Sequence, residues 1–181
     1  MLEQIEKQKQ DQWITTVGNQ SLWSISFNKK DLFNETSARS LYFVNNKLQQ
    51  EVKSDTPVIL DDDRNLFDRY LEVAIQDVLV LLSRRIPQSA DDYPELMKQG
   101  KYDTTPVIND SYMLEVTLVM SENHDKNLIQ ALRGYCKEYL VKKVLEMWFG
   151  VDFGSAEEPS KINHILQFRR RSAARRVRPL L

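Results

Sequence analysis

Two long segments with a helical spacing of apolar residues constrain the fold of this chain more than any other feature. In the first, from about residue 63 to 85, one face carries Phe67, Leu71, Ala74, Ile75, Val78, Leu81 and Leu82. Val73 and Val80 widen this apolar arc, so we expect the helix to be central and largely buried. Carboxylates at Asp61, Asp62 and Asp63 favour a helix start, because free N–H groups and the helix dipole attract negative charge there.

The second segment, from about residue 126 to 149, predicts a helix of similar length that packs against the first. Its apolar stripe is Leu128, Leu132, Tyr135, Cys136, Tyr139, Leu140, Val144, Met147 and Trp148. Gly150 follows the last apolar turn, at a position where glycine commonly ends a helix. Residues 158–160 then begin a short third helix, with Ile162 and Leu166 on one side.

Shorter segments predict a β-containing part. Residues 13–17 and 22–27 are β-prone and flank a polar turn, which indicates a hairpin. Residues 41–44 are a further candidate strand, followed by a polar loop over 47–56. Residues 111–120 alternate between an apolar and a mixed face, which is typical of a strand.

These elements together predict a mainly α fold with a β-containing part. We divide the chain into a partly β N-terminal element (1–60), a helical core with a β insertion (61–160), and a short helix with an extended, arginine-rich C-terminal tail (161–181). With 181 residues, of which 41% are hydrophobic, the chain is near the size of one domain and has enough apolar residues for a core.

Composition and motif content argue against catalysis, cofactors and membranes. The mean hydropathy is −0.50, and no apolar run approaches the roughly 18 to 20 residues of a membrane-spanning helix. The first residues lack the basic patch and apolar stretch of a signal peptide. One cysteine and two histidines supply no metal-ligand cluster, and neither a glycine-rich phosphate loop nor a nucleophile elbow is present. We therefore expect no enzyme, no cofactor, no metal site and a reducing environment.

Several candidate chemical groups have plainer structural explanations. Cys136 lies on the apolar stripe, where a thiol acts as a small hydrophobic group. His124 and His164 lack a neighbouring ligand and are predicted to be surface or capping residues. Helix capping explains residues 61–63 better than a bound cation does. Asp77 is either a buried carboxylate or, as we favour, part of a narrow polar edge of the first helix.

Charge divides the chain at residue 160. Of the 25 Lys and Arg, 18 precede residue 161 together with all 26 Asp and Glu, which gives residues 1–160 a net charge of −8. Six of the seven remaining basic residues are Arg169, Arg170, Arg171, Arg175, Arg176 and Arg178. Such a run attracts nucleic-acid phosphate, an acidic protein groove, or the acidic body of this or a neighbouring copy. Because Leu180 and Leu181 end the run, we predict a docking arm rather than a solvated helix end.

Aromatic residues gather at the end of the second long helix. Trp148 and Phe149 are followed by Phe153, and glycines and acids border the group. Such a cluster is most often part of a core, but it is also typical of contacts between subunits. We therefore regard Trp148, Phe149 and Phe153 as candidates for a subunit interface.

From residue 61 onward the order of elements resembles the head-to-tail connector proteins of tailed bacteriophages, also called adaptors or head-completion proteins. The matching stretches, within residues 61–178, are DDDRNLFDRYLEVAIQDVLVLLSRRI, NLIQALRGYCKEYLVKKVLEMWF and INHILQFRRR. The family pattern is an acidic helix start, two long apolar helices separated by a β-containing insertion, and a short helix with a basic C-terminal run. The first 60 residues and the long loop over 88–110 depart from the shorter members.

The resemblance implies a structural virion protein of the phage neck, made in the cytoplasm of the bacterial host. Its copies would form a ring beneath the portal protein, let DNA pass through the lumen without specific binding, and receive the tail or further connector proteins. The six arginines, with Leu180 and Leu181, would dock on the portal. The alternative is a nucleic-acid-binding or helical interaction protein whose arginine-rich C-terminus contacts phosphate or an acidic partner.

Overall fold

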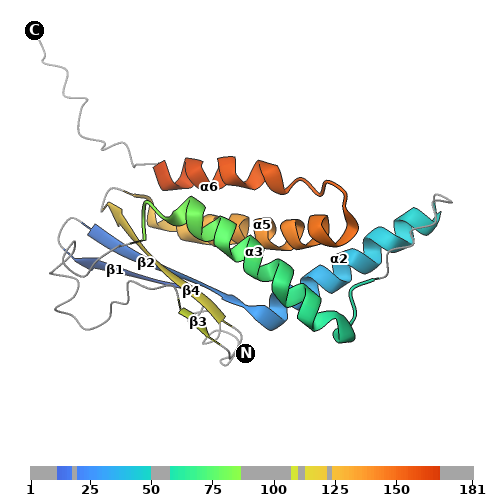
Figure 1. Cartoon of the computed structure of the whole chain (residues 1–181). Coiled ribbons are helices and arrows are strands. Elements are labelled where there is room, and N and C mark those ends of the chain that lie inside the picture. The colour runs from blue at the N-terminus through green and yellow to red at the C-terminus, as the bar shows by residue number, and fades with distance from the viewer. Residues whose placement is uncertain are drawn as a thin grey trace, which may run out of the picture.

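The computed structural model of the chain describes residues 12–17, 20–49, 58–86, 107–109, 113–121 and 124–167. Within them, a four-stranded antiparallel sheet packs against a group of helices (Figure 1). The central helix is α5 (Ile129–Phe149), which contacts α2 (Lys29–Gln49), α3 (Arg64–Leu82), α6 (Glu158–Gln167) and the strand β2 (Gln20–Asn28). The predicted mainly α fold with a β-containing part is confirmed.

The sheet has the strand order β1, β2, β4, β3. The predicted hairpin is formed by β1 (Gln12–Val17) and β2, and the strand predicted over 111–120 is β4 (Met113–Ser121). A short strand, β3 (Val107–Asn109), pairs with the first residues of β4. Because β2 also pairs with β4, with Trp23 opposite Leu118, the hairpin and the strand between the two long helices belong to one sheet.

The predicted strand at residues 41–44 is wrong, because α2 runs through these residues and ends at Gln49. The helix begins after Asn28, whose Oδ1 accepts hydrogen bonds from two backbone N–H groups of the first turn. Its buried face includes Thr36 and Ser40, whose hydroxyls donate to helix carbonyls at 2.7 Å. These buried positions are polar, so apolar periodicity does not reveal the helix.

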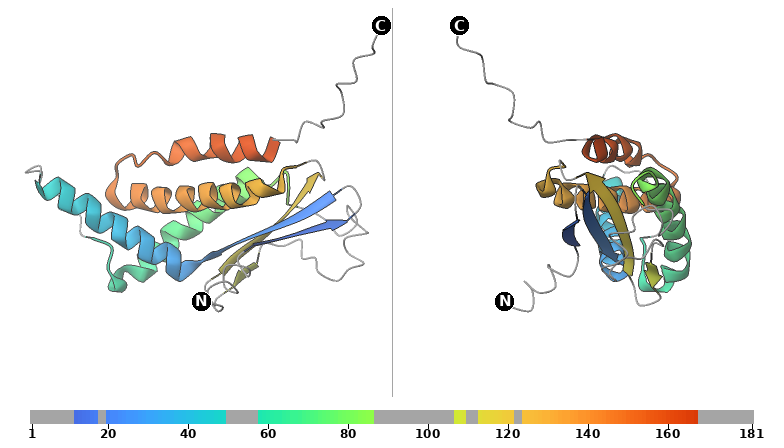
Figure 2. Two further views of the ribbon diagram at one scale, coloured as in Figure 1. Left: turned by 180° about the vertical axis from the view of Figure 1, so that it is seen from behind. Right: turned by 90° about the vertical axis from the view of Figure 1, so that its left-hand side faces the viewer.

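The two long packed helices are confirmed as α3 and α5, and Val78, Leu132 and Leu140 between them are completely buried. The expectation that α3 is largely buried is wrong, because Val73 is 50% and Val80 is 72% exposed. The physical reason is the position of α3. It lies at one outer side of the molecule (Figure 2, right), so one of its faces is left uncovered.

The turn that joins α5 to α6 is organised by Glu146. Gly150 ends α5 with a φ of 67°, a left-handed conformation that glycine adopts without strain. The carboxylate of Glu146 then accepts hydrogen bonds from the backbone N–H groups of Phe153 and Ser155, at 3.2 and 2.9 Å, and from the Ser155 hydroxyl at 2.6 Å. The chain therefore reverses, and α6 packs along α5 with Ile162 buried, as the predicted short third helix.

Candidate functional site

The residues predicted to dock on a partner, Arg169, Arg170, Arg171, Arg175, Arg176, Arg178, Leu180 and Leu181, lie outside the described residues. The end of α6, just before this run, is described. The carbonyl oxygen of Leu166 accepts hydrogen bonds from Nη2 of Arg85 at 2.8 Å and from Nε2 of His124 at 3.0 Å. Leu166 and its neighbour Ile165 are also buried. The arginine run therefore begins three residues after Leu166, a point that is fixed to the body.

His124 is not the surface or capping residue that the sequence predicted, since it is only 2% exposed. Its ring meets Trp23 edge to face, with the ring centroids 6.2 Å apart. Among the described residues, neither Nδ1 of His124 nor Nε1 of Trp23 has a hydrogen-bond partner. The residues next to His124 in sequence are polar and do not indicate a buried position, because the groups that contact its ring are Trp23 of β2 and the carbonyl of Leu166 in α6. His164 is exposed, as predicted.

The aromatic cluster at the end of α5 is packed within the chain. Phe43 of α2 contacts the rings of Phe149 and Phe153 at centroid distances of 4.7 and 5.0 Å, and these two rings are 5.9 Å apart. Trp148 lies on a different side of α5 and meets Tyr70 of α3 at 6.3 Å. All three predicted interface residues are half-buried. Phe43, which sequence reasoning placed in a strand, is the contact that this reasoning missed.

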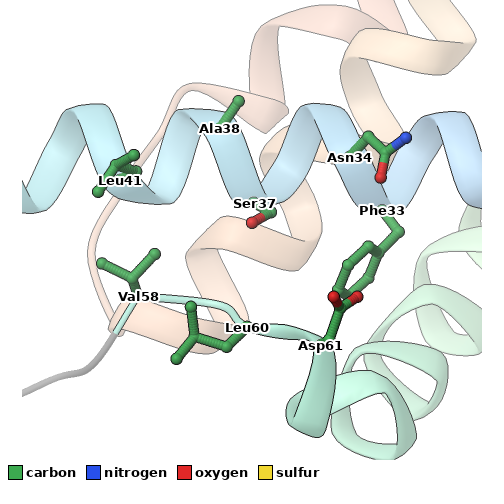
Figure 3. Close-up of a pocket in the computed structure, with 8 residues that line it drawn as sticks. All are labelled: Phe33, Asn34, Ser37, Ala38, Leu41, Val58, Leu60 and Asp61. Atoms are coloured by element: carbon green, nitrogen blue, oxygen red, sulfur yellow. The ribbon is translucent and has the colours of Figure 1, made fainter.

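An apolar groove lies between α2 and the extended segment that leads to α3 (Figure 3). One wall is formed by the α2 residues Phe33, Asn34, Ser37, Ala38 and Leu41, and the other by Val58, Leu60 and Asp61. Its volume is about 670 Å³. Leu41 is 50% and Leu60 is 59% exposed, so apolar side chains at the groove remain in contact with water. We call this feature the α2 groove.

Hydrogen bonds hold the two walls of the α2 groove together. The backbone carbonyl of Ile59 accepts from the hydroxyl of Ser37 at 2.7 Å, and its N–H donates to the hydroxyl of Ser40 at 3.1 Å. Ile59 is completely buried, and these two serines satisfy both of its backbone polar groups. At the end of the segment, the carboxylate of Asp63 accepts from the N–H of Leu60 at 2.8 Å. The groove is therefore set by specific backbone contacts.

A charged network fixes α2 to α5. Arg39 donates to both carboxylate oxygens of Glu138, at 2.9 and 2.6 Å, and to Glu35 at 2.5 Å. Lys137 also pairs with Glu35. The hydrogen bonds from Arg39 hold the pKa of Glu138 below its usual value, and those to Glu138 raise the pKa of Arg39. The bidentate pair therefore positions the α2 wall of the groove relative to the core.

The exposed face of α3 forms a second apolar surface. Leu66, Val73 and Val80, at a spacing of seven residues, are 39%, 50% and 72% exposed. Arg69 is exposed on the same face of the helix, and Arg84 is exposed in the turn that follows it. We call this surface, defined by these five residues, the α3 ridge.

The remaining candidates have structural roles. Cys136 is completely buried on the predicted stripe, and burial raises the pKa of its thiol to about 12. Asp77 is half-buried and accepts a hydrogen bond from the hydroxyl of Tyr139 at 2.9 Å. Burial, with help from this hydrogen bond, raises the pKa of Tyr139 to about 12. Asp61–Asp63 form a 3-10 turn that leads into α3, so the predicted helix start is confirmed; the carboxylate of Asp63 bonds back to the N–H of Leu60 and does not cap an N–H group of α3.

Comparison with family models, curated proteins and solved structures found no match for this chain. Across the described residues, no helix combines the length and the apolar character needed to span a membrane. In the same part of the chain, no three His, Cys, Asp or Glu side chains are grouped so that they could hold a metal ion.

Proposed function

We propose that the chain is a structural virion protein of a tailed phage, which forms a ring between the portal and the tail and lets DNA pass. The observation that carries the proposal is the fixed start of the arginine run. Arg85 of the α3 end and His124 before α5 both hold the carbonyl of Leu166, in the last turn of α6. An arm that begins at a fixed point presents the same basic segment in the same place on every copy of a ring.

Repetition matters because each contact of such an arm is weak. A surface pair between arginine and a carboxylate contributes only about 0 to 1 kcal/mol. Several arms that engage one portal at the same time bind far more tightly than a single arm, because each later contact is intramolecular. The acidic body, with its net charge of −8 over residues 1–160, repels a DNA duplex that passes through the lumen.

Deletion of residues 169–181 tests the proposal. The shortened protein should fail to join particles that carry the portal protein of the same virus, as measured by the composition of purified particles. Ser172→Ala is the matched control, because it changes the same segment and keeps every arginine and leucine. If the deletion variant joined the particles as efficiently as the full chain, the arm would not be the docking segment.

The second candidate function is nucleic-acid binding, which the six arginines within residues 169–178 favour. A salt titration separates the two functions. Duplex binding through Z arginines should weaken with a logarithmic slope near −0.9Z, whereas the proposed adaptor should have no appreciable duplex affinity at about 0.15 M salt. Binding to an acidic protein, but to neither DNA nor portal particles, would identify a helical interaction protein instead.

A further inference from the structure

The α3 ridge and the α2 groove are exposed apolar surfaces of opposite shape. Residues seven apart on an α-helix are nearly aligned, with a drift of about 20°. At a rise of about 1.5 Å per residue, Leu66, Val73 and Val80 therefore form a convex line roughly 21 Å long. The α2 groove, of about 670 Å³, is concave and bordered by the exposed Leu41 and Leu60. A helix ridge that packs into a groove is the usual geometry of helix association.

The two surfaces also differ in charge. Arg69 lies between Leu66 and Val73 on the ridge, and Arg84 follows Val80. The groove ends at Asp61, whose side chain is 81% exposed although it pairs with Arg64 at 2.8 Å. The ridge therefore carries the basic Arg69, and the groove offers the exposed carboxylate of Asp61, so a ridge and a groove can bring opposite charges together.

The ridge of one molecule does not fill its own groove. Near their first turns α2 and α3 touch, with the rings of Phe33 and Phe67 5.0 Å apart. Beyond this point the two helices diverge (Figure 1), so the later turns of α3 lie progressively farther from the α2 groove. An α3 ridge that fills the groove would therefore belong to a second molecule.

We infer that the α3 ridge of one copy packs into the α2 groove of the next copy of this chain. The contact is heterologous, because it joins two different surfaces, and so it propagates from copy to copy as a ring requires. The inference deepens the proposed function, since it names the surfaces through which copies of the ring associate, and it rests on the self-association in that proposal.

Disulfide trapping between two single-site variants tests the pairing. Val73→Cys and Leu41→Cys should form a covalent dimer when mixed under mild oxidation, and neither should do so alone. The native Cys136 is completely buried and does not interfere. A dimer of Val73→Cys with itself would show a symmetric contact and overturn the inference. Absence of the mixed dimer under conditions in which electron microscopy shows rings would also overturn it.

Association measured by sedimentation tests the energetics. Val80→Glu, in the exposed ridge, should raise the dissociation constant at least tenfold, while the fold is retained. Glu72→Ala is the matched control, because residue 72 is exposed on α3 but lies about 100° around the helix from Val73. Arg69→Glu should weaken association, and Asp61→Lys in the same chain should restore it. Equal association of all these variants would overturn the inference.

These outcomes separate the inference from the proposed function. Wild-type protein that joins portal particles as a ring, but gives no trapped ridge-to-groove dimer, overturns the surface assignment alone. A trapped dimer in a protein that never joins portal particles confirms the surface pair and contradicts the proposed function alone.

Discussion

Glu158, the first residue of α6, is the most buried carboxylate in the described part of the chain, at 1% exposure. Its Oε1 accepts hydrogen bonds from Lys142 at 2.7 Å and from Lys161 at 2.9 Å, and its Oε2 has no partner there. Burial acts to raise the pKa of Glu158, but the two lysines more than offset it, so the pKa lies below its usual value. The ion pair therefore fixes the start of α6 to α5.

Glu158→Gln should lower the free energy of unfolding by about 1 to 3 kcal/mol at pH 7, because it leaves Lys142 without its counter-charge. A depressed pKa means that the unfolded state binds the proton more readily. The stabilisation is therefore present above the unfolded pKa of about 4.3 and is lost as the pH falls through the folded value. Urea denaturation should show the wild-type advantage shrinking below pH 4. If the difference in unfolding free energy between the wild type and Glu158→Gln stayed constant with pH, the charge of this carboxylate would not contribute to stability.

The buried His124 supports a second prediction at the scale of single residues. His124→Ala removes a buried ring and one of the two hydrogen bonds to Leu166, and it should cost about 2 to 4 kcal/mol by chemical denaturation. Amide exchange at the end of α6 should also accelerate, since Arg85 alone then holds that turn. His164→Ala, at an exposed site on α6, should change neither quantity. If His124→Ala left the free energy of unfolding unchanged, the buried position of the His124 ring would be contradicted.

At the scale of elements, the two sides of α3 allow a matched comparison. Ile75→Ala and Leu132→Ala should each cost about 2 to 5 kcal/mol, because both residues are buried in the hydrophobic core. Val73→Ala should change the stability of the monomer by less than about 0.5 kcal/mol, because half of this side chain already meets water. Thermal and urea unfolding at low protein concentration measure these differences. If Val73→Ala and Ile75→Ala lowered the free energy of unfolding equally, the α3 ridge would be covered within the monomer.

The same comparison shows which elements the sequence could predict. Apolar periodicity and turn residues predict α3, α5, β2 and β4 to within about three residues at each end, because each of them buries an apolar face. The helix α2 does not, since Thr36 and Ser40 lie on its buried face and the β-prone residues 41–44 follow them. Periodicity measures which residues are apolar, not which are covered, so it also placed Val73 and Val80 in the core.

The candidate site was less predictable than the fold. The α2 groove depends on Ser37 and Ser40, whose hydroxyls bond the backbone of Ile59 about 20 residues later in the chain. The fixed end of α6 depends on Arg85 and His124, which lie far from Leu166 in sequence. Such contacts are set by tertiary packing and have no short sequence signature. The arginine run, in contrast, is a local feature of composition that the sequence shows directly.

For the whole molecule, the opposite charges of the body and the C-terminal arm raise the question of whether the two bind each other. Deletion of residues 169–181 removes six arginines and changes the formal net charge from −1 to −7. If the arm folded back onto its own acidic body, its loss would cost roughly 1 to 3 kcal/mol at low salt, since each exposed pair contributes about 0 to 1 kcal/mol. For a chain of this size, each kcal/mol corresponds to about 2 to 4 °C in the thermal midpoint.

We expect the full chain and the shortened chain to unfold at the same temperature within about 1 °C, at both about 0.02 M and 0.5 M salt. The reason is that Arg85 and His124 hold the end of α6, and that an arm reserved for a partner should gain nothing from its own body. Differential scanning calorimetry of the two proteins is the measurement. The contrary outcome is a thermal midpoint that falls by several degrees on deletion at low salt, with no such difference at high salt. It would show that the arginines bind the acidic body of the same molecule. The arm would then not be free to dock on the portal.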